Sequence, residues 1–508
     1  MSPKGVAGLA SFSLLTECWI PARDLEGRLR EVSLHEALRH APSLRRIEDP
    51  SPLVEIALHR FLLAVLHRAM DGPPDEETVL DWWDAGSFPE KRLCEYLDKH
   101  SDRFDLFHPL RPFYQVADLP DEDPLPWTKL LPERASGHNP TLFDHSVDTD
   151  PPPARPAEVA RALLVHESFA PRGLIQRLGV TSGKSGPLAA CAVFLALGRN
   201  LFETLLLNLV QYRGEGDGPL WECAPYHTSD VEGGRAQESL WGRTRVYTWL
   251  SRAVRLLPDT DGRVRFIAYG PGLSPREGRF ERDPMCAYVK SKSAGLVAVH
   301  LPPDGAFWRD FAALLPNEGH VHPRVLEHAR FLLMERGRGD AFLLPLAVFG
   351  QVTDPGKPAK IVSSRREVYP FPIAAWDQEV AAEIHWAVNL AEETGRRLRD
   401  VGLTLAKSLL SSAGRQPERR ETSRLVTSFP LLPAYWSGLD VAFPRFLTTI
   451  ANGDRSSACT VWLGTLGEQV KHAWDHTLRF VGLGSRHLKA IEAGERGVAG
   501  IMTGLQRR

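Results

Sequence analysis

The chain has 508 residues, of which 43% are hydrophobic and 24% are charged, a composition that is ordinary for a globular protein with a large core. This length predicts two to four domains. The formal net charge of −2 excludes a molecule that is basic on average, so any surface for nucleic acid must be a local patch.

The six cysteines are far apart in the sequence, and none forms a Cys-x-x-Cys pair. This spacing argues against a zinc ribbon and against the disulfide framework of a small secreted protein. A reducing cytoplasm fits best, and we predict no metal and no cofactor.

Two apolar stretches are candidates, one for a signal peptide and one for a membrane-spanning segment. Val6 to Leu15 follows a single lysine, as in a signal peptide, but no clear small-residue cleavage site comes after it. The longest apolar run, Pro187 to Leu197, is too short to cross a bilayer and predicts a buried helix or strand. We therefore expect a cytoplasmic protein without a membrane segment.

Residues 1 to about 120 alternate extended pieces with helices, and helices are predicted at Ser33–Arg39 and Ile56–Met70, where apolar side chains recur three and four positions apart. Strand patterns return between about 245 and 362. The strand candidates there are Val264–Tyr269, Ala287–Lys292, Gly295–His300 and Ala341–Val348. The amino-terminal part is thus predicted to be mixed α and β.

The stretch from Leu130 to Ser146 has the composition of neither a helix nor a strand. Gly137 and Asn139 favour a sharp turn that leaves His138 and Phe143 free to point outward. On residue types alone, two interpretations remain open. The stretch is either an ordinary surface turn with Phe143 packed on the core, or a loop that enters a groove.

Gly179 to Gly186 resembles a phosphate-binding P-loop, but only three residues separate the first glycine from Gly-Lys-Ser, whereas the NTPase motif needs four. We therefore do not predict nucleotide hydrolysis. Glycines in this region expose backbone N–H groups and allow close approach of a nucleic-acid backbone, with Arg172 and Lys184 supplying charge.

Residues 350 to 361 predict a β-hairpin with Asp-Pro-Gly-Lys, 354 to 357, as its turn. After Tyr369-Pro-Phe-Pro the chain becomes helical to its end. Two apolar stripes have helical spacing. They are Trp376, Val380, Ile384, Ala387, Ala391 and Leu398, and Trp462, Leu466, Val470, Trp474 and Leu478.

Breaks near 414–420, 451–454 and 482–484 divide this tail into four helices, which predicts an antiparallel bundle. The predicted fold class is therefore α+β. A large mixed α/β amino-terminal domain, residues 1–365, is followed by a carboxyl-terminal four-helix bundle, residues 366–508.

One group of residues suggests catalysis. Glu468, His472 and His476 are spaced by four and would share a helical face, as metal ligands do. His320 and His322 form a second pair without an obvious third partner. The chain has neither His-Glu-x-x-His nor Gly-x-Ser-x-Gly. A cytoplasmic hydrolase with a His/carboxylate site remains the alternative hypothesis.

The sequence Ser-Gly-His-Asn-Pro-Thr-Leu-Phe-Asp-His, residues 136 to 145, resembles the DNA-proximal loop of the CasA family, the large subunit of the type I-E CRISPR surveillance complex Cascade. Four other stretches agree with that family in order and spacing. They are 12–21 (FSLLTECWIP), 107–116 (FHPLRPFYQV), 203–210 (ETLLLNLV) and 282–288 (RDPMCAY). The resemblance covers most of the chain.

This resemblance implies a non-catalytic subunit of an antiviral complex. The family recognises the protospacer-adjacent motif in duplex DNA, helps start strand separation and R-loop formation, and helps recruit the helicase-nuclease. Guide-RNA pairing identifies the rest of the target. The implied partners are double-stranded target DNA, a crRNA-containing Cascade with its backbone and small subunits, and the helicase-nuclease.

The resemblance also implies four DNA-binding elements in the amino-terminal domain. A motif-recognition loop contains Gly137, His138, Asn139 and Phe143; a glycine loop contains Arg172, Gly173 and Lys184; a lysine finger is Lys290, with Lys292 beside it; and a wedge hairpin contains Thr353, Asp354, Gly356, Lys357, Pro358 and Lys360. The family often has glutamine at the wedge tip, where this chain has Lys357 or Pro358. This chain also has fewer glycines near Gly173 than its relatives have. It has only Cys286 in the region where some relatives have a cysteine cluster.

Overall fold

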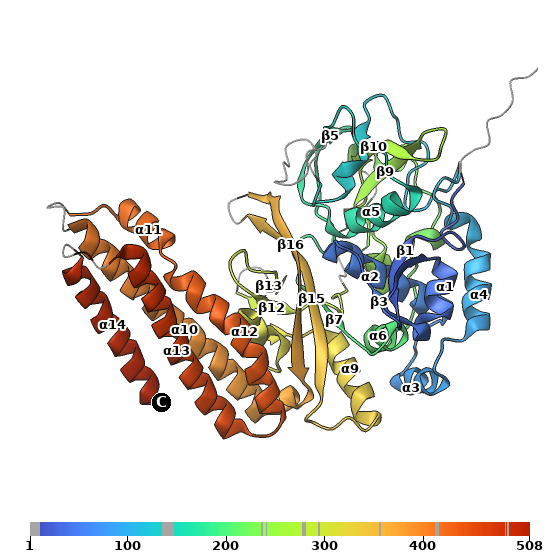
Figure 1. Ribbon diagram of the computed structural model, residues 1–508. Coiled ribbons are helices and arrows are strands. Elements are labelled where there is room, and N and C mark those ends of the chain that lie inside the picture. Colours follow the sequence, from blue (N-terminus) through green and yellow to red (C-terminus); the bar gives the residue numbers. More distant parts are fainter. Residues whose placement is uncertain are drawn as a thin grey trace, which may run out of the picture. The chain divides into compact units, whose positions relative to one another are not determined.

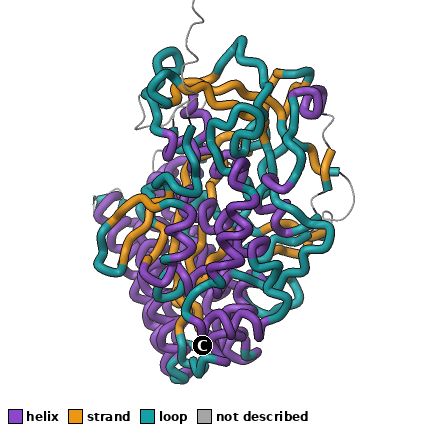
Figure 2. Tube along the Cα trace, turned by 90° about the vertical axis from the view of Figure 1, so that its right-hand side faces the viewer, coloured by secondary structure: helices purple, strands orange, loops and turns teal. Residues whose placement is uncertain are grey.

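The computed structural model describes residues 11–134, 147–234, 237–239, 241–276, 281–292, 295–354, 357–411, 416–482, 484 and 487–508, with the backbone alone at Leu174 and at 357–359. The chain divides into two compact units, each with its own core. Unit 1 comprises 1–303, 322–336 and 345–368, and unit 2 comprises 304–321, 337–344 and 369–508. The mixed α and β architecture with a helical carboxyl-terminal part is the predicted fold class (Figures 1 and 2).

Unit 1 contains short helices and small sheets. Its helices are α1 (Leu34–Arg39), α2 (Pro52–Ala69), α3 (Glu76–Ala85), α4 (Glu90–Lys99), α5 (Pro156–Phe169), α6 (Leu201–Asn208), α7 (Thr228–Val231), α8 (Arg243–Tyr247) and α9 (Arg324–Glu335). Ser33 begins α1 with a capping box, in which its side chain accepts from the backbone of Glu36 and the Glu36 carboxylate accepts from Ser33.

The strands assigned wholly to unit 1 form several small sheets and part of a larger one. They are β1 (Ile20–Asp24), β2 (Leu29–Val32), β3 (Leu44–Ile47), β4 (Leu125–Pro126), β5 (Gly173–Arg177), β6 (Val180–Gly183), β7 (Val193–Ala196), β8 (Gln237–Glu238), β9 (Arg252–Pro258), β10 (Val264–Pro271), β11 (Ser274–Pro275), β12 (Tyr288–Ser291) and β13 (Gly295–Ala298). The sheet orders are β2-β1-β3 and β4-β10-β9, with β5-β6 as an antiparallel hairpin and β8-β11 as a parallel pair. β12 and β13 form a further antiparallel hairpin.

Two long strands, β15 (Leu343–Asp354) and β16 (Lys357–Pro372), form the predicted hairpin. Together with β7 they make the sheet β16-β15-β7, which we call the interface sheet (Figure 1). The hairpin is longer than predicted, because Tyr369 to Pro372 continues β16 and does not form a separate junction before the helices.

The core of unit 1 is built around α2, which is buried along nearly its whole length. Phe61 packs edge to face against Trp19, Phe113 and Trp221, each with a ring-centroid separation of 5.7 Å. Trp19 and Phe113 belong to two of the stretches that resemble the CasA family. Those stretches therefore contribute to one aromatic core.

Unit 2 contains the predicted bundle and the short strand β14 (His320–Val321). Its helices are α10 (Gln378–Ser411), α11 (Arg419–Ser428), α12 (Leu431–Ala451), α13 (Arg455–Val481) and α14 (Leu488–Gln506). α10, α12, α13 and α14 are the four long helices, and the short α11 was not predicted. Trp376 lies in the 3-10 turn η7 (Ile373–Trp376) before α10, so it is not part of the helical stripe.

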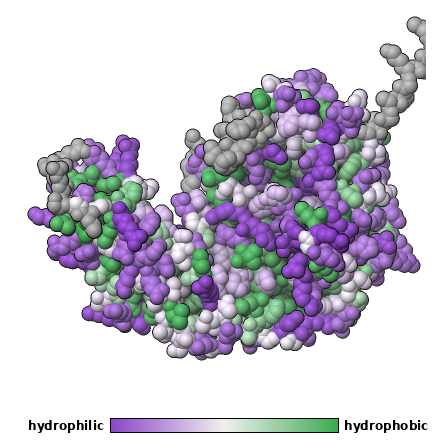
Figure 3. Space-filling model, viewed as in Figure 1, coloured by the Kyte–Doolittle hydropathy of each residue, from purple (hydrophilic) through white to green (hydrophobic). Residues whose placement is uncertain are grey.

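The predicted apolar stripes on α10 and α13 are buried, except for Leu478 near the end of α13, which is half-buried. Trp462 on α13 donates its indole N–H to the carbonyl of Ala387 on α10, at 3.0 Å. Trp308, from the turn η6 (Phe307–Leu314), stacks on Phe443 with ring centroids 4.7 Å apart and donates to Asp440 at 2.7 Å. Apolar atoms also interrupt the polar surface of this unit in Figure 3.

No helix in the described part of the chain is both long enough and apolar enough to span a membrane.

Two glycines of α14 provide a test of how closely the bundle is packed. A Cβ added at Gly494 would lie 2.2 Å from a ring carbon of Trp474, whereas one added at Gly500 would meet no atom within 4 Å. We expect Gly494→Ala to destabilise the protein by about 1–3 kcal/mol through overpacking. Gly500→Ala should stabilise it by up to about 1 kcal/mol, because alanine is the better helix former. Thermal unfolding of both variants measures this, and equal shifts would contradict the packing.

Candidate nucleic-acid interface

The interface sheet is the structural element to which the predicted DNA-binding segments are joined. β15 is its central strand and pairs with β7 from Leu346 opposite Ala196 to Phe349 opposite Val193. Gly350 follows, and a Cβ there would lie only 2.8 Å from the carbonyl oxygen of Cys191. Glycine therefore permits the close approach of the chain that leads into β7.

Gln351 connects β15 to both ends of the predicted glycine loop. Its side chain is 3% exposed, and its amide nitrogen donates to the carbonyls of Phe169, at 3.1 Å, and Ala189, at 2.7 Å. Phe169 ends α5 just before the loop, and Ala189 follows it. One buried amide thus satisfies two backbone carbonyls that would otherwise be unpaired away from water.

The glycine loop is the hairpin of β5 and β6, with Gly173 opposite Gly183. Gln176, Leu178 and Gly179 all have positive φ, between 48° and 71°, at its turn. Gly179 is thus a turn residue followed by a strand, which is not the strand–loop–helix context of a P-loop. This geometry agrees with the exclusion made from the spacing.

Arg252 lies behind this hairpin, is 2% exposed, and donates to the carbonyls of Lys184, at 2.6 Å, and Pro171, at 2.7 Å. A side chain at Gly183 would collide with it, since a Cβ there would lie 2.9 Å from the guanidinium carbon. The side chains of Arg172 and Lys184 are exposed. A buried arginine therefore fixes the backbone next to two solvated cationic side chains.

The predicted lysine finger lies on the hairpin of β12 and β13. Lys290 is opposite Leu296, and both side chains are exposed, as is Lys292. The base of the hairpin contacts β7, because the backbone N–H of Ala192 donates to Val299 at 2.7 Å. On the other side of this base, the Arg365 guanidinium of β16 donates to the carbonyl of Pro302.

The residues predicted for the motif-recognition loop, Gly137, His138, Asn139 and Phe143, lie outside the described residues. The chain just before the loop is fixed by Glu133. Its carboxylate accepts from Ser51, at 2.7 Å, and from Ser364 of β16, at 2.9 Å. On the far side, Trp127 donates its indole N–H to the carbonyl of Pro152 at 2.8 Å.

The predicted wedge is the end of the β15–β16 hairpin. Thr353 and Asp354 are half-buried at the end of β15, and Lys360 is exposed on β16. Gly356 lies outside the described residues, and for Lys357 and Pro358 only the backbone is described, as part of β16.

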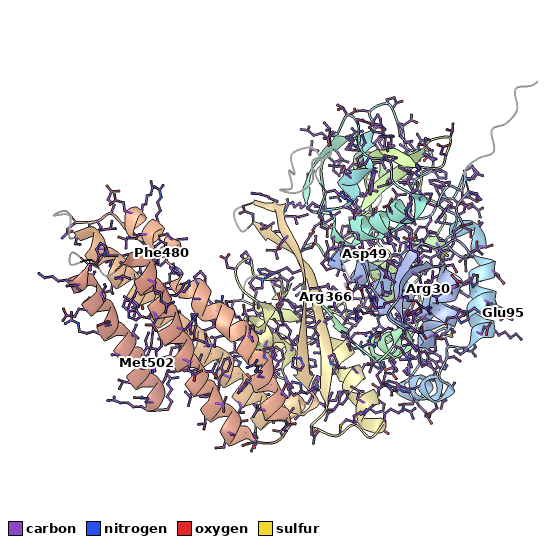
Figure 4. All side chains as sticks on the ribbon, viewed as in Figure 1. Arg30, Asp49, Glu95, Arg366, Phe480 and Met502 are labelled. Carbon is purple, nitrogen blue, oxygen red and sulfur yellow. The ribbon has the colours of Figure 1, made fainter. Side chains whose placement is uncertain are left out.

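Two buried carboxyl groups support these elements. Glu55 of α2 lies 3.2 Å from the Arg366 guanidinium on β16, and burial raises its pKa to about 7 (Figure 4 labels Arg366). Glu167 accepts from the backbone N–H of Arg252 at 3.0 Å, and burial raises its pKa to about 8. Desolvation dominates in both, because the nearby arginines lower the pKa by less.

The structure does not assemble the residues of the alternative catalytic site. Among the described residues, no group of three or more His, Cys, Asp or Glu side chains is placed to hold a metal. His472 and His476 stack on each other with centroids 6.1 Å apart, and both are exposed on α13 with Glu468. His322 hydrogen-bonds to Glu327 at 2.7 Å.

The bases of the four predicted elements are therefore joined to the interface sheet through Gln351, Glu133 and Arg365. Arg252, which belongs to β9, supports the glycine loop from a second sheet. None of these four residues was predicted from the sequence. A polar residue in the apolar run of β15 was the one available signal for Gln351. No contact between the exposed side chains of Lys184, Lys290 and Lys360 is present among the described residues.

Comparison with known proteins adds an independent finding. The family model for CRISPR-associated protein Cse1 matches residues 13–481. The CasA/Cse1 protein of Thermus thermophilus is 47% identical over 496 residues, which is 97% of each chain.

Solved structures agree with the sequence match. A crystal structure of Thermus thermophilus CasA superposes with a TM-score of 0.88 at 44% identity and covers 97% of this chain and 99% of that one. Thermobifida fusca Cse1, at 24% identity and 98% coverage of both chains, has a TM-score of 0.78 and shows the same fold. A chain of a CRISPR RNA-guided surveillance complex, at 23% identity, covers 97% of this chain and 99% of that one, with a TM-score of 0.73.

The role of Gln351 can be tested by hydrogen exchange. Gln351→Ala leaves the carbonyls of Phe169 and Ala189 without a donor, which should cost about 2–3 kcal/mol of stability. We expect faster exchange of the peptide covering residues 170–188, measured by mass spectrometry. Gln378→Ala, at an exposed position, is the matched control. Unchanged exchange in 170–188 would show that Gln351 does not hold the hairpin.

Proposed function

Because the chain belongs to the CasA/Cse1 family and is the large subunit of a CRISPR Cascade complex, we propose that it recognises the protospacer-adjacent motif in duplex DNA and helps to open the duplex there. The complex is of type I-E in this proposal. The guide RNA then identifies the target by base pairing, and the large subunit supplies the protein contacts to the short motif.

The observation that supports this proposal is the common attachment of the DNA-binding elements. The described parts of the hairpins carry exposed cations, such as Lys184, Lys290 and Lys360, while their bases are hydrogen-bonded to the interface sheet or to the chain that leads into it. Exposed lysines retain their donors for phosphate or base-edge contacts. Fixed bases reduce the conformational entropy lost on binding.

Gly173 supports contact with a duplex groove for a separate reason. A Cβ added there would meet no atom within 4 Å, and its φ is outside the left-handed region. The fold therefore does not require glycine at this position. A nucleic-acid backbone that approaches the hairpin closely would require it, since any side chain would occupy the contact distance.

The wedge hairpin would begin strand separation. Unstacking a base step costs a few kcal/mol, so the inserted element must be rigid and supported. Gln351 and the Glu55–Arg366 ion pair fix the hairpin to the rest of unit 1. Minor-groove recognition of the motif would be permissive, because A·T and T·A present the same acceptors there.

The chain acts without catalysis in this proposal. Its partners are double-stranded target DNA and the crRNA, backbone and small subunits of Cascade. A separate helicase-nuclease, which this subunit helps recruit, degrades the opened target. Among the described residues, buried histidines such as His59 and His328 hydrogen-bond to backbone carbonyls, at 2.8 and 3.0 Å, and have their pKa lowered to about 4 by burial.

The Gly173 argument gives a direct test in the assembled complex. We expect Gly173→Val to leave thermal stability unchanged but to weaken binding to motif-bearing duplexes by roughly tenfold, the order of one lost contact. Gel-shift titrations with and without the motif measure the effect. Gly339→Val in unit 2 is the control, because a Cβ there also meets no atom within 4 Å. Binding as tight as that of the Gly339→Val control would contradict a close approach of the duplex at Gly173.

Lys290 distinguishes a base contact from a phosphate contact. If it contacts a base edge, Lys290→Ala should cost on the order of 1–3 kcal/mol for motif-bearing duplexes alone. If it contacts phosphate, binding should weaken evenly across sequences and the salt dependence should become shallower by about one charge. Lys99→Ala removes an equivalent exposed charge and is the control. If Lys290→Ala and Lys99→Ala have the same affinity and the same salt dependence, Lys290 does not contact the DNA.

A further inference from the structure

Unit 1 contains a polar pocket of about 710 Å³ whose lining residues are not part of the interface described above. Its walls come from residues 211–217, from 241–243, from Glu281 and Arg282, and from Arg324 at the start of α9. Backbone hydrogen bonds fix two of these walls. Tyr212 donates to Pro73 at 2.7 Å, and Val325 donates to Pro284 at 3.1 Å.

Two of the acidic residues in this pocket already have partners. Asp217 accepts from the Tyr212 hydroxyl at 2.6 Å and from the backbone N–H groups of Thr244 and Arg245, at 2.7 and 3.0 Å. Glu281 lies 3.5 Å from the Arg243 guanidinium. Arg243 therefore offsets the charge of Glu281. Asp217 stabilises the start of α8 and keeps its negative charge, because all of these donors are neutral.

Three arginines at the pocket surface, in contrast, have no hydrogen-bond or ion-pair partner among the described residues. Arg213, Arg282 and Arg324 are exposed, and within the described part of the chain none makes a hydrogen bond or ion pair. Their guanidinium groups cannot lose their protons at any physiological pH. Against these three arginines, the lining has the carboxylates of Glu215 and Asp217, while Arg243 is paired with Glu281. The pocket lining therefore has a net charge of +1, from four arginines and three carboxylates.

Arg324 makes this excess more significant. It is the first residue of α9, a 12-residue helix whose N-cap, Pro323, provides no side-chain hydrogen bond. A cation at a helix N-terminus is unfavourable and an anion there is favourable, because of the helix dipole. The backbone N–H groups of Val325 and Leu326 already donate to the carbonyls of Pro284 and Pro323, so the hydrogen bonds to an anion would come from the arginine side chains. An anionic group between Arg324 and Arg282 would thus offset the unfavourable position of the Arg324 charge.

Trp241 adds an aromatic surface to the same pocket. It is 43% exposed, although tryptophan is ordinarily well buried. Nucleobases stack on exposed aromatic rings with little dependence on sequence, while arginines contact the adjoining phosphates. Trp241, Arg282 and Arg324 are all exposed on the wall of one pocket, so an aromatic ring and two cations are accessible from the same side.

We propose that this pocket binds a nucleotide of a single-stranded nucleic acid, with its phosphate between Arg282 and Arg324 and its base on Trp241. The inference rests on the proposed function for the ligand's identity, because a complex that opens DNA beside a guide RNA offers two single strands. The shared chemistry is a phosphodiester with a stacked base.

The test uses the purified full-length chain and two fluorescein-labelled probes, a 12-nucleotide oligo(dT) and a 12-nucleotide oligo(U). Fluorescence anisotropy measures their affinity. We expect the double variant Arg282→Ala/Arg324→Ala, and separately Trp241→Ala, to bind both probes roughly tenfold more weakly than the parent. For the arginine variant, the slope of log affinity against log salt should also become shallower by about 0.7 per lost phosphate contact.

The matched control is Arg30→Ala/Arg45→Ala, which removes the same charge from exposed positions outside the pocket (Figure 4 labels Arg30). It should bind the probes within about twofold of the parent, because screened distant charges contribute weakly. Equal losses in the pocket and control variants would overturn the proposal. So would unchanged binding by Trp241→Ala.

Photocrosslinking in the assembled complex then distinguishes the two sources. One arm carries 4-thiouridine in the guide RNA, and the other carries 5-iododeoxyuridine in the displaced strand. A nucleotide adduct on the Trp241 peptide in either arm supports the site and names its strand, whereas no adduct in both arms overturns it. Motif-dependent duplex binding by the parent is measured in parallel, so that failure of the proposed function is recognised separately from failure of this pocket.

Discussion

The satisfaction of buried backbone carbonyls around the interface sheet is the constraint on which the rest of unit 1 depends. Each carbonyl that leaves a regular strand or helix in the core must find a donor. Gln351 serves Phe169 and Ala189, and Arg252 serves Pro171 and Lys184. These four acceptors flank the hairpin of β5 and β6. Two side chains therefore determine where the chain leaves and re-enters the core on either side of this hairpin, without any contact to the turn itself.

In this arrangement, the residues that stabilise the hairpins differ from the exposed residues that are available to bind a ligand. Gln351 and Arg252, which hold the hairpin of β5 and β6, are buried, so solvent and salt screen them little. The lysines on the hairpins are exposed and retain their hydrogen-bond donors. A substitution at an exposed lysine should leave the fold almost unchanged. A substitution at a buried connector acts on both properties, because it alters the position from which the exposed residues project. The geometry thus predicts two distinguishable classes of variant in one interface.

The sequence was sufficient to predict elements that are determined by residues close together in the chain. The burial of Trp462, Leu466, Val470 and Trp474 follows from their spacing alone, and the Asp-Pro-Gly-Lys turn indicated the hairpin. It was insufficient for Gln351 and Arg252, because their acceptors lie 182 and 68 positions away and no local pattern encodes such pairs. The assignment of DNA-binding roles rested on resemblance to the CasA family, since the residue types alone also allowed a surface turn or a hydrolase.

The partners of the arginines explain why a net charge of −2 is compatible with binding nucleic acid. Counting cations gives 61 Lys and Arg, but a guanidinium whose donors already serve the protein offers nothing to a phosphate. Arg60 is paired with Asp283 at 2.6 Å, and Arg252 is occupied by carbonyls, so both belong to the core. Arg282 and Arg324 are exposed without partners among the described residues, and Arg324 opposes a helix dipole. Such exposed guanidinium groups keep their donors available, which is how a chain of slightly negative net charge can offer cations to a phosphate at particular places on its surface.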